Sequence, residues 1–213
     1  MNLVGSYQVI AQPTQEPVSL AEAKSHLRVD GNYDDALINL CISSARMYFE
    51  NACQIHIAQK TVQLCMDSFP PTVPNLTVTS NINYPFQTKY YPFDGTIYLQ
   101  GPVQSVESVT YIDTNLVEQT FGNCRVDLVS SPARITLTTG TTWPTTAKLT
   151  NSVKVNYTAG FHHEKVPKLL KSGILFYMAH LYENREAATT ANLTETPLAV
   201  ESIIQQYSSG VYH

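Results

Sequence analysis

Histidine and carboxylate side chains gather at two places in the sequence where their spacing is compatible with metal binding. His162, His163 and Glu164 are adjacent, and imidazole and carboxylate groups are ordinary zinc ligands. His180 and Glu183 are three residues apart, which puts them on one face of a helix. Adjacent side chains in a connecting segment rarely converge on one ion. A ferritin-like site at His180 and Glu183 would need more carboxylates on neighbouring helices, and the second predicted helix offers none at matching positions. We therefore expect no metal and no cofactor.

The sequence also lacks a complete set of groups for nucleophilic catalysis. Cys124 is a thiol that would need a nearby base, and nothing in the sequence points to one. There is no glycine-rich phosphate-binding motif and no G-x-S-x-G motif. The four cysteines lack C-x-x-C spacing, which favours free thiols. We predict that the protein is not an enzyme; a hydrolase with an unrecognised site is an alternative that an activity screen would test.

The charges argue against a protein that holds nucleic acid. Lys165, Lys168 and Lys171 recur every third residue, either as a basic strip facing DNA or an acidic partner, or as a solvated helix face. The formal net charge is −4, whereas a protein that grips DNA needs a basic footprint. We expect nonspecific contact with duplex DNA at most. No stretch approaches the roughly 18 apolar residues of a membrane helix, so we expect no membrane partner.

Aromatic side chains suggest a second class of function. Trp143 and Pro144 lie in a threonine-rich segment, and Tyr90 and Tyr91 form another aromatic group. Such rings serve as platforms in carbohydrate-binding or adhesin-like modules, but a tryptophan in a loop also anchors that loop by packing. Both interpretations stay open, and a glycan array would separate them.

Hydrophobic periodicity predicts helices over residues 19–55 and 166–207 and strands between them. Ser19 and Glu22 form a capping box at the start of the first helix, and Asn32 can cap a second one. Pro167 suits the first turn of a third helix. Apolar alternation predicts several short strands; their apolar positions are Val62, Leu64, Met66, Ile97, Leu99, Val126, Leu128, Ile135, Leu137, Val153, Val155 and Tyr157.

These elements define the predicted fold class. We expect an α+β protein: a helical bundle formed by both chain ends, with an inserted antiparallel domain that resembles a β-sandwich or barrel. The predicted boundaries are 1–59 for the first half of the helical domain, 60–158 for the β domain, and 159–213 for the second helical half with its C-terminal tail. Prolines punctuate residues 70–95, whose role the sequence does not define.

The apolar stripes of the helices are wider than one packed face requires. In the second predicted helix, Leu37, Cys41 and Ala45 form the stripe and further apolar residues widen it. Such breadth means burial on more than one side, either inside the core or against a neighbouring subunit. For a subunit interface the candidates are Ile38, Ile42, Phe49, Phe176 and Tyr182.

Several segments, in order along the chain, resemble phage head–tail connector proteins of the long form with an inserted β domain. They are residues 17–24 (PVSLAEAK), 26–30 (HLRVD), 34–38 (DDALI), 101–106 (GPVQSV), 109–113 (VTYID), 157–161 (YTAGF), 166–167 (VP), 180–187 (HLYENREA) and 197–201 (PLAVE). The resemblance implies a structural virion protein, located in the neck of the particle and assembled in the host cytoplasm. It brings no catalytic or cofactor residues.

The resemblance also implies partners. Copies of the chain would form a ring, usually twelvefold, below the portal protein. The ring would extend the DNA channel, let double-stranded DNA pass without tight binding, and present a surface to the next neck or tail-completion protein. The segment from Glu186 to His213 contains no lysine or arginine, which suits a basic groove. We expect Tyr207, Val211 and Tyr212 to dock on the portal.

Overall fold

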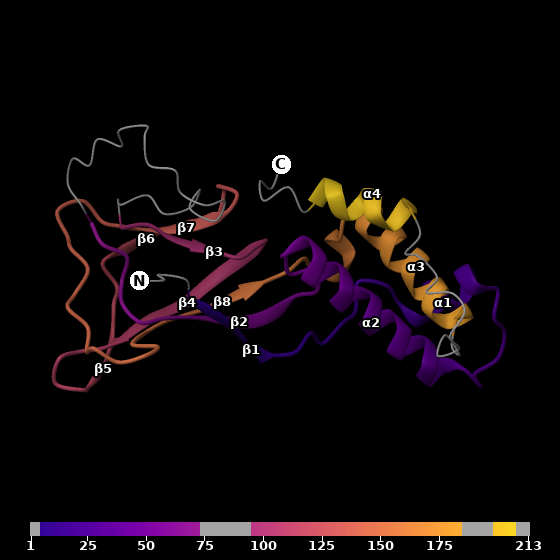
Figure 1. The fold of residues 1–213 in the computed structure, drawn as a ribbon, viewed down its shortest axis with the longest axis horizontal. Coiled ribbons are helices and arrows are strands. Elements are labelled where there is room, and N and C mark those ends of the chain that lie inside the picture. Colours follow the sequence, from indigo (N-terminus) through magenta and orange to yellow (C-terminus); the bar gives the residue numbers. More distant parts are fainter. Residues whose placement is uncertain (1–4, 73–94, 185–197, 208–213) are drawn as a thin grey trace, which may run out of the picture. The chain divides into compact units, whose positions relative to one another are not determined.

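Helices come from both ends of the chain and strands from its middle, with one exception at the N-terminus (Figure 1). The structure is a computed structural model that describes residues 5–72, 95–184 and 198–207. Its chain divides into two compact units: the described parts of Met1–Gln12 and Thr61–Thr158, and those of Pro13–Lys60 and Ala159–His213. The structure is therefore mixed α+β, with four α-helices and antiparallel strand pairs among the described residues.

The exception corrects the predicted boundary of the first segment. Residues 1–59 were all expected in the helical domain, but β1 (Ser6–Ala11) pairs antiparallel with β2 (Lys60–Met66), and the helical unit begins at Pro13. All six side chains of β1 are exposed, so the strand has no buried face. In the sequence, polar and apolar residues alternate only from Ser6 to Val9, and Ile10 and Ala11 break the pattern, so the signal for a strand is short.

The helical unit contains α1 (Leu20–Leu27), α2 (Asp35–Cys53), α3 (Lys168–Glu183) and α4 (Leu198–Tyr207), with a short 3-10 turn at His163–Lys165. The predicted capping box is present at α1: the Glu22 amide donates to Ser19 Oγ at 3.2 Å, and the Ser19 amide donates to the Glu22 carboxylate at 2.8 Å. Two of the backbone donors that every helix start leaves free are satisfied in this way.

Asn32 does not cap α2 as expected. The helix starts at Asp35 after Asp34, and no side chain caps it through a hydrogen bond. The side-chain oxygen Oδ1 of Asn32 instead accepts from the Lys24 ammonium at 3.2 Å, and the same ammonium pairs with Asp35 at 2.7 Å. A tertiary contact between α1 and the start of α2 thus uses the side chain that the local pattern assigned to a cap.

Residues from both chain ends share one hydrophobic core in the helical unit. Ile174 of α3 is fully buried there, and Leu37 of α2 packs against the same cluster. The Tyr48 and Tyr177 rings stack with centroids 4.1 Å apart, which joins α2 to α3. Helices α1 and α4 each contact both α2 and α3. The α2–α3 pair is therefore the centre of this unit, and it explains why α2 is apolar on several sides.

The β unit contains two sheets among the described residues. One has the order β1-β2-β8-β4-β5 and the other β3-β7-β6. Antiparallel pairing joins β1 to β2, β4 to β5, and both β3 and β6 to β7. The remaining bounds are β3 (Ile97–Leu99), β4 (Val103–Ile112), β5 (Glu118–Thr120), β6 (Cys124–Asp127), β7 (Ala133–Leu137) and β8 (Val153–Ala159).

Alternation marks the sheet interior where a strand has one buried face. In β8 the residues Val153, Val155 and Tyr157 are fully buried, and the residues between them are half-buried. The Tyr157 hydroxyl donates to the Gln100 carbonyl at 3.2 Å, which satisfies the one polar group of this buried ring.

Within the part of the chain described here, no helix has both the length and the hydropathy to cross a membrane.

Candidate interaction surfaces

The histidine and carboxylate groups that could bind metal do not converge. The Glu164 carboxylate lies 3.9 Å from His162 Nδ1 and 4.0 Å from His163 Nε2, which is the upper limit for an ion pair. The Glu164 side chain is exposed. His180 contacts Asn184, with ring nitrogen and amide 3.2 Å apart. In residues 5–72, 95–184 and 198–207, no three His, Cys, Asp or Glu side chains are grouped to hold a metal ion.

Trp143 is held as a packed loop anchor. Its ring stacks on Phe69 with centroids 4.5 Å apart and an interplanar angle of 6°. Its indole N–H donates to the Gly95 carbonyl at 2.7 Å. One face of the ring is therefore covered by the protein itself. Tyr90 and Tyr91, the other aromatic group, lie outside the described residues.

The Cys124 thiol has no feature of a nucleophile. Burial raises its pKa, which lowers the fraction of the reactive thiolate.

The three lysines near the start of α3 have different surroundings. Lys165 and Lys168 are exposed, whereas the Lys171 ammonium lies 3.4 Å from the Glu22 carboxylate of α1. This contact also contributes to holding the pKa of Glu22 below its ordinary value, after the backbone and side-chain hydrogen bonds from Ser19. The lysines therefore do not form one free basic strip.

Three of the five candidate interface residues lie inside the subunit. Ile38, Ile42 and Phe49 are at most 1% exposed and belong to the core of the helical unit. Their assignment to a subunit interface is corrected, because the other helices of the same chain cover the broad stripe of α2. Phe176 is 43% exposed, and Tyr182 is half-buried and donates from its hydroxyl to Asp34. Only Phe176 presents a large apolar surface.

Of the three candidate docking residues, Tyr207 lies in the described chain. It ends α4 and packs, partly buried, against the helical core. Val200 and Ile203 of the same helix are buried. Val211 and Tyr212 lie outside the described residues.

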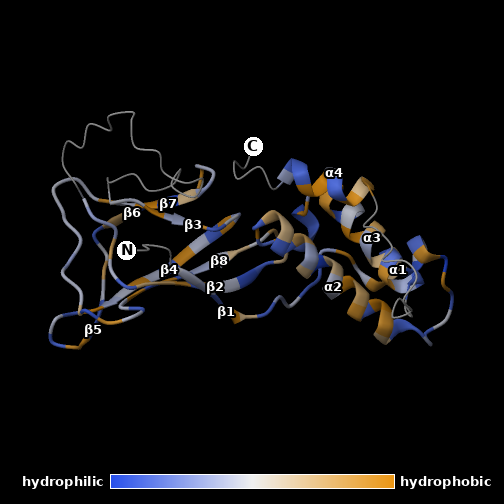
Figure 2. Cartoon of the chain, in the orientation of Figure 1, coloured by the Kyte–Doolittle hydropathy of each residue, from blue (hydrophilic) through white to orange (hydrophobic). Residues whose placement is uncertain are grey.

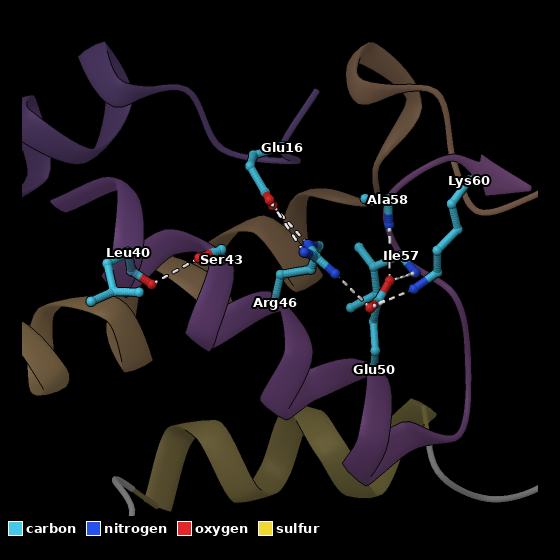
Figure 3. Close-up of polar contacts among 8 residues, drawn as sticks. All are labelled: Glu16, Leu40, Ser43, Arg46, Glu50, Ile57, Ala58 and Lys60. Carbon is cyan, nitrogen blue, oxygen red and sulfur yellow. Dashed lines mark hydrogen bonds and ion pairs between the residues drawn. The ribbon is translucent and has the colours of Figure 1, made fainter. Parts of the chain in front are cut away.

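A group of four charged side chains, which sequence reasoning missed, lies at the end of α2 (Figure 3). Arg46 donates to Glu50 at 2.7 Å and, from the other side of its guanidinium, to Glu16 at 2.7 and 3.2 Å. The Lys60 ammonium donates to the same Glu50 carboxylate at 2.8 Å. The Arg46, Glu50 and Lys60 side chains are all at most 7% exposed. We call these four residues the ion network; its charges balance.

Glu50 is the hub of the ion network because it also receives two backbone amides. The Ile57 and Ala58 N–H groups donate to its second oxygen at 2.8 and 3.3 Å. Burial by itself would raise the pKa of Glu50, but the hydrogen bond and charge of Lys60, the charge of Arg46 and the Ile57 amide outweigh it and hold the pKa below its ordinary value. The carboxylate thus fixes the segment that follows α2.

A sequence signal for the ion network does exist. Ile38, Ile42, Arg46 and Glu50 follow one another at intervals of four, so they run along one line of α2. Arg46 and Glu50 continue the line of the buried Ile38 and Ile42. Charged side chains at such positions must either reach solvent or be neutralised by partners of opposite charge. The partner Glu16 lies 30 residues before Arg46 and Lys60 lies 10 residues after Glu50, and both are outside the helix, so the helical pattern alone did not reveal them.

A family model and several solved structures are similar to parts or nearly all of this chain. Residues 17–90 match the sequence model of a family described as phage gp6-like head–tail connector protein. The fold is similar to a chain in the neck of an empty gene transfer agent (GTA) particle computed with C6 symmetry: the TM-score is 0.70 and the identity 17%, over 95% of this chain and 94% of that one.

Two further solved structures contain a similar chain. One is the virion of a native GTA particle, with a TM-score of 0.69 and 17% identity over 94% of each chain. The other is the neck of a native GTA particle computed with C12 symmetry, with a TM-score of 0.61 and 17% identity over 93% of this chain and 94% of that one. No curated protein matches the sequence.

Proposed function

We infer that this chain is a structural subunit of the neck of a phage-like particle. Its residues 17–90 match the head–tail connector family, and its fold over nearly the whole length is similar to that of a chain in the neck of a GTA particle. The observation that carries the function is the family match over residues 17–90, which include α1, α2 and β2. The predicted resemblance to head–tail connectors is confirmed by this match and by the similar neck chains. No comparison supports the carbohydrate-binding alternative.

The assembled form that we propose is a ring. Similar chains occur in necks computed with C6 and C12 symmetry, which supports a closed ring of identical subunits, twelve in the simplest case. In this proposal the helices from both chain ends form one bundle that makes the body of the ring, and the subunits assemble in the host cytoplasm before joining the particle.

The ring joins two partners and surrounds the DNA channel. We propose that it sits below the portal protein, extends the channel and offers its other side to the next neck or tail-completion protein. A net charge of −4 supports passage of double-stranded DNA without tight binding, because like charges prevent adhesion. The role is structural, and it requires no catalytic group.

Light scattering tests this function directly. The mass of the purified protein is measured alone and with the portal protein of the same particle. We expect a complex of the portal with a ring of this chain, and cosedimentation with portal-containing heads. A chain that stays monomeric with the portal and does not cosediment with such heads is not a connector. An array of glycans run in parallel would reveal a carbohydrate-binding module if one ligand class were retained.

A further inference from the structure

The loop that joins β4 to β5 in the β unit shows two adjacent aliphatic side chains to solvent (Figure 1). Leu116 is 69% exposed and Val117 is 51% exposed. Figure 2 shows hydrophobic and hydrophilic residues side by side in this loop. A single exposed aliphatic residue is ordinary on a protein surface, so the conformation of the loop decides whether this pair has a role.

Leu116 also has a backbone conformation that does not suit its side chain. Its φ is +63°, in the left-handed region where the β-carbon of an L residue crowds the backbone. The Leu116 amide donates to the Asp113 carbonyl at 3.0 Å, so residues 113–116 form a turn. A left-handed residue that ends such a turn in a hairpin is usually glycine, and asparagine also tolerates the conformation. Leucine is an unfavourable choice at this position.

Among the residues that the structure describes, three other non-glycine residues have a positive φ, and each has a local reason. Arg28 and Gln54 end α1 and α2, where a left-handed residue is a common way to terminate a helix. Asn151 is of a residue type that tolerates this region. Leu116 has neither reason. An exposed apolar side chain and an unfavourable backbone thus coincide at one position, a combination that points to a role outside the fold.

Hydrogen bonds hold the loop in one shape. The Asp113 carboxylate accepts from the amides of Asn115 at 2.8 Å and Val117 at 3.0 Å. It also accepts from the Gln119 side chain at 3.1 Å. These bonds, the one from the Val117 amide first, hold the pKa of Asp113 below its ordinary value, so the carboxylate stays charged at neutral pH. Leu116 and Val117 are therefore presented on a preorganised loop, which lowers the entropy cost of binding.

The charge of the hairpin indicates the chemistry of a partner. Residues 103–123 contain Glu107, Asp113 and Glu118 and no lysine or arginine. Glu118 is exposed and directly follows Val117. A partner that buries the aliphatic pair also meets this carboxylate, so it needs an apolar pocket bordered by lysine or arginine. This chain has a net charge of −4 and on average repels an acidic hairpin, which favours a different protein over a second copy.

We propose that the β4–β5 hairpin is a docking point for another protein of the particle. Leu116 and Val117 insert into an apolar pocket of that protein, and Glu118 pairs with a cation at the edge of the pocket. This inference rests on the proposed place of the chain in the neck, where it joins partners of different sequence. It assigns one of these contacts to the β unit.

Leu116→Asn separates a role in docking from a role in the fold. Asparagine suits the positive φ, so the purified variant should unfold at the temperature of the unaltered protein or up to about 4 °C above it. In cells where the variant is the only copy, the yield of complete particles should fall about tenfold or more, because every subunit lacks the contact. Thr114→Ala, at another exposed position of the loop, is the control and should change neither quantity.

Charge reversal tests for the cation in the partner. Glu118→Lys should reduce the yield of complete particles in the same assay. Glu164→Lys makes the same charge change at an exposed position of the helical unit and should leave the yield unchanged. An equal loss in both variants would show a general effect of charge and would count against the proposed docking point.

Photo-cross-linking in assembled particles identifies the partner. The photoreactive residue p-benzoylphenylalanine replaces Val117, and purified particles are irradiated. We expect this chain to be joined to one other particle protein, at a site where apolar residues lie next to lysine or arginine. Cross-links confined to copies of this chain, or no cross-link to another protein, overturn the proposal.

The same experiments distinguish failure of this inference from failure of the proposed function. A Leu116→Asn protein that unfolds at a lower temperature shows that the leucine serves the fold, and one that gives a normal yield of particles shows that no partner needs it. Either result overturns the docking point and leaves the place of the chain in the neck intact. If the unaltered chain is absent from purified particles, both the inference and the proposed function fail.

Discussion

The Glu50 carboxylate of α2 and the Lys60 ammonium at the start of β2 form an ion pair 2.8 Å long, although both side chains are buried. Glu50 also binds Arg46 and the amides of Ile57 and Ala58, so one carboxylate holds the end of α2, the segment after it and the first residue of the strand. The Glu50–Lys60 ion pair therefore lies at the end of the first segment of the helical unit, whose last residue is Lys60.

Removal of the hub should destabilise the protein strongly. Glu50→Ala leaves the buried Lys60 ammonium and two amides without their acceptor and removes one of the two carboxylates that bind Arg46, and breaking a buried ion pair from one side costs about 3–5 kcal/mol. Urea unfolding measures this loss as a lower midpoint. The control is Asn51→Ala, which alters the next, exposed residue and should change the free energy of unfolding by under about 0.5 kcal/mol. Equal stability of the two variants would show that the ion network contributes little.

His56 should make stability fall in mild acid. Burial, followed by the charge of Lys60, lowers the pKa of His56 from its ordinary value of 6.5 to about 4, against a smaller opposing effect of Glu50. Between these two values the unfolded chain binds a proton and the folded chain does not, so unfolding becomes easier as the pH falls. The expected slope approaches about 1.4 kcal/mol per pH unit.

The measurement is a series of urea unfolding curves between pH 7 and pH 5, above the range in which ordinary carboxylates titrate. His56→Leu removes the titrating group and should flatten the dependence in this interval. His162→Leu, at a half-exposed position, serves as the control and should keep the slope of the unaltered protein. A wild-type protein whose stability is constant across the interval contradicts the assignment.

Local sequence patterns predict the structure correctly where the interacting residues are close in sequence. Ser19 and Glu22 are three residues apart, and their capping box is found as predicted. The alternation of Val153, Val155 and Tyr157 likewise predicted β8, because its buried face belongs to one strand. In such cases the residues that decide the structure are themselves adjacent or nearly so.

Sequence patterns do not predict the environment of a side chain whose partner lies in another element. The sequence does not show that Lys24 takes up Asn32, or that Glu16 and Lys60 neutralise Arg46 and Glu50. For the same reason Ile38, Ile42 and Phe49 of α2 could be interpreted as a subunit contact, although the packing of the helical unit buries them.

A single methyl group tests whether α2, α3 and α4 pack as described. A Cβ on Gly173 of α3 would lie 2.6 Å from Phe49 Cζ and 3.3 Å from Ile203 Cδ1. Gly173→Ala should therefore destabilise by about 1–3 kcal/mol, despite the better helix propensity of alanine. Gly122→Ala has open space and should be close to neutral. Adding Phe49→Leu to Gly173→Ala should restore part of the loss, and absence of any coupling in thermal unfolding would contradict this packing.

Deletion of residues 208–213 tests the proposed docking of the C-terminal tail. We expect the truncated protein to keep its unfolding temperature but to lose cosedimentation with portal-containing heads. Tyr207→Ala provides the contrast, because Tyr207 packs against the helical core and its loss should lower the unfolding temperature. A truncated protein that joins heads normally, or one that unfolds at a lower temperature, refutes the docking role.

The central claim is that this chain forms a ring in the neck of a particle, and imaging of assembled particles tests it most directly. Particles that carry a tagged version of the chain are reconstructed by electron cryomicroscopy with and without a tag-binding antibody fragment. The account predicts a ring of density between head and tail that binds the fragment in every subunit. Label found along the tail or on the head shell, or particles that keep a complete neck when the chain is absent, would contradict it.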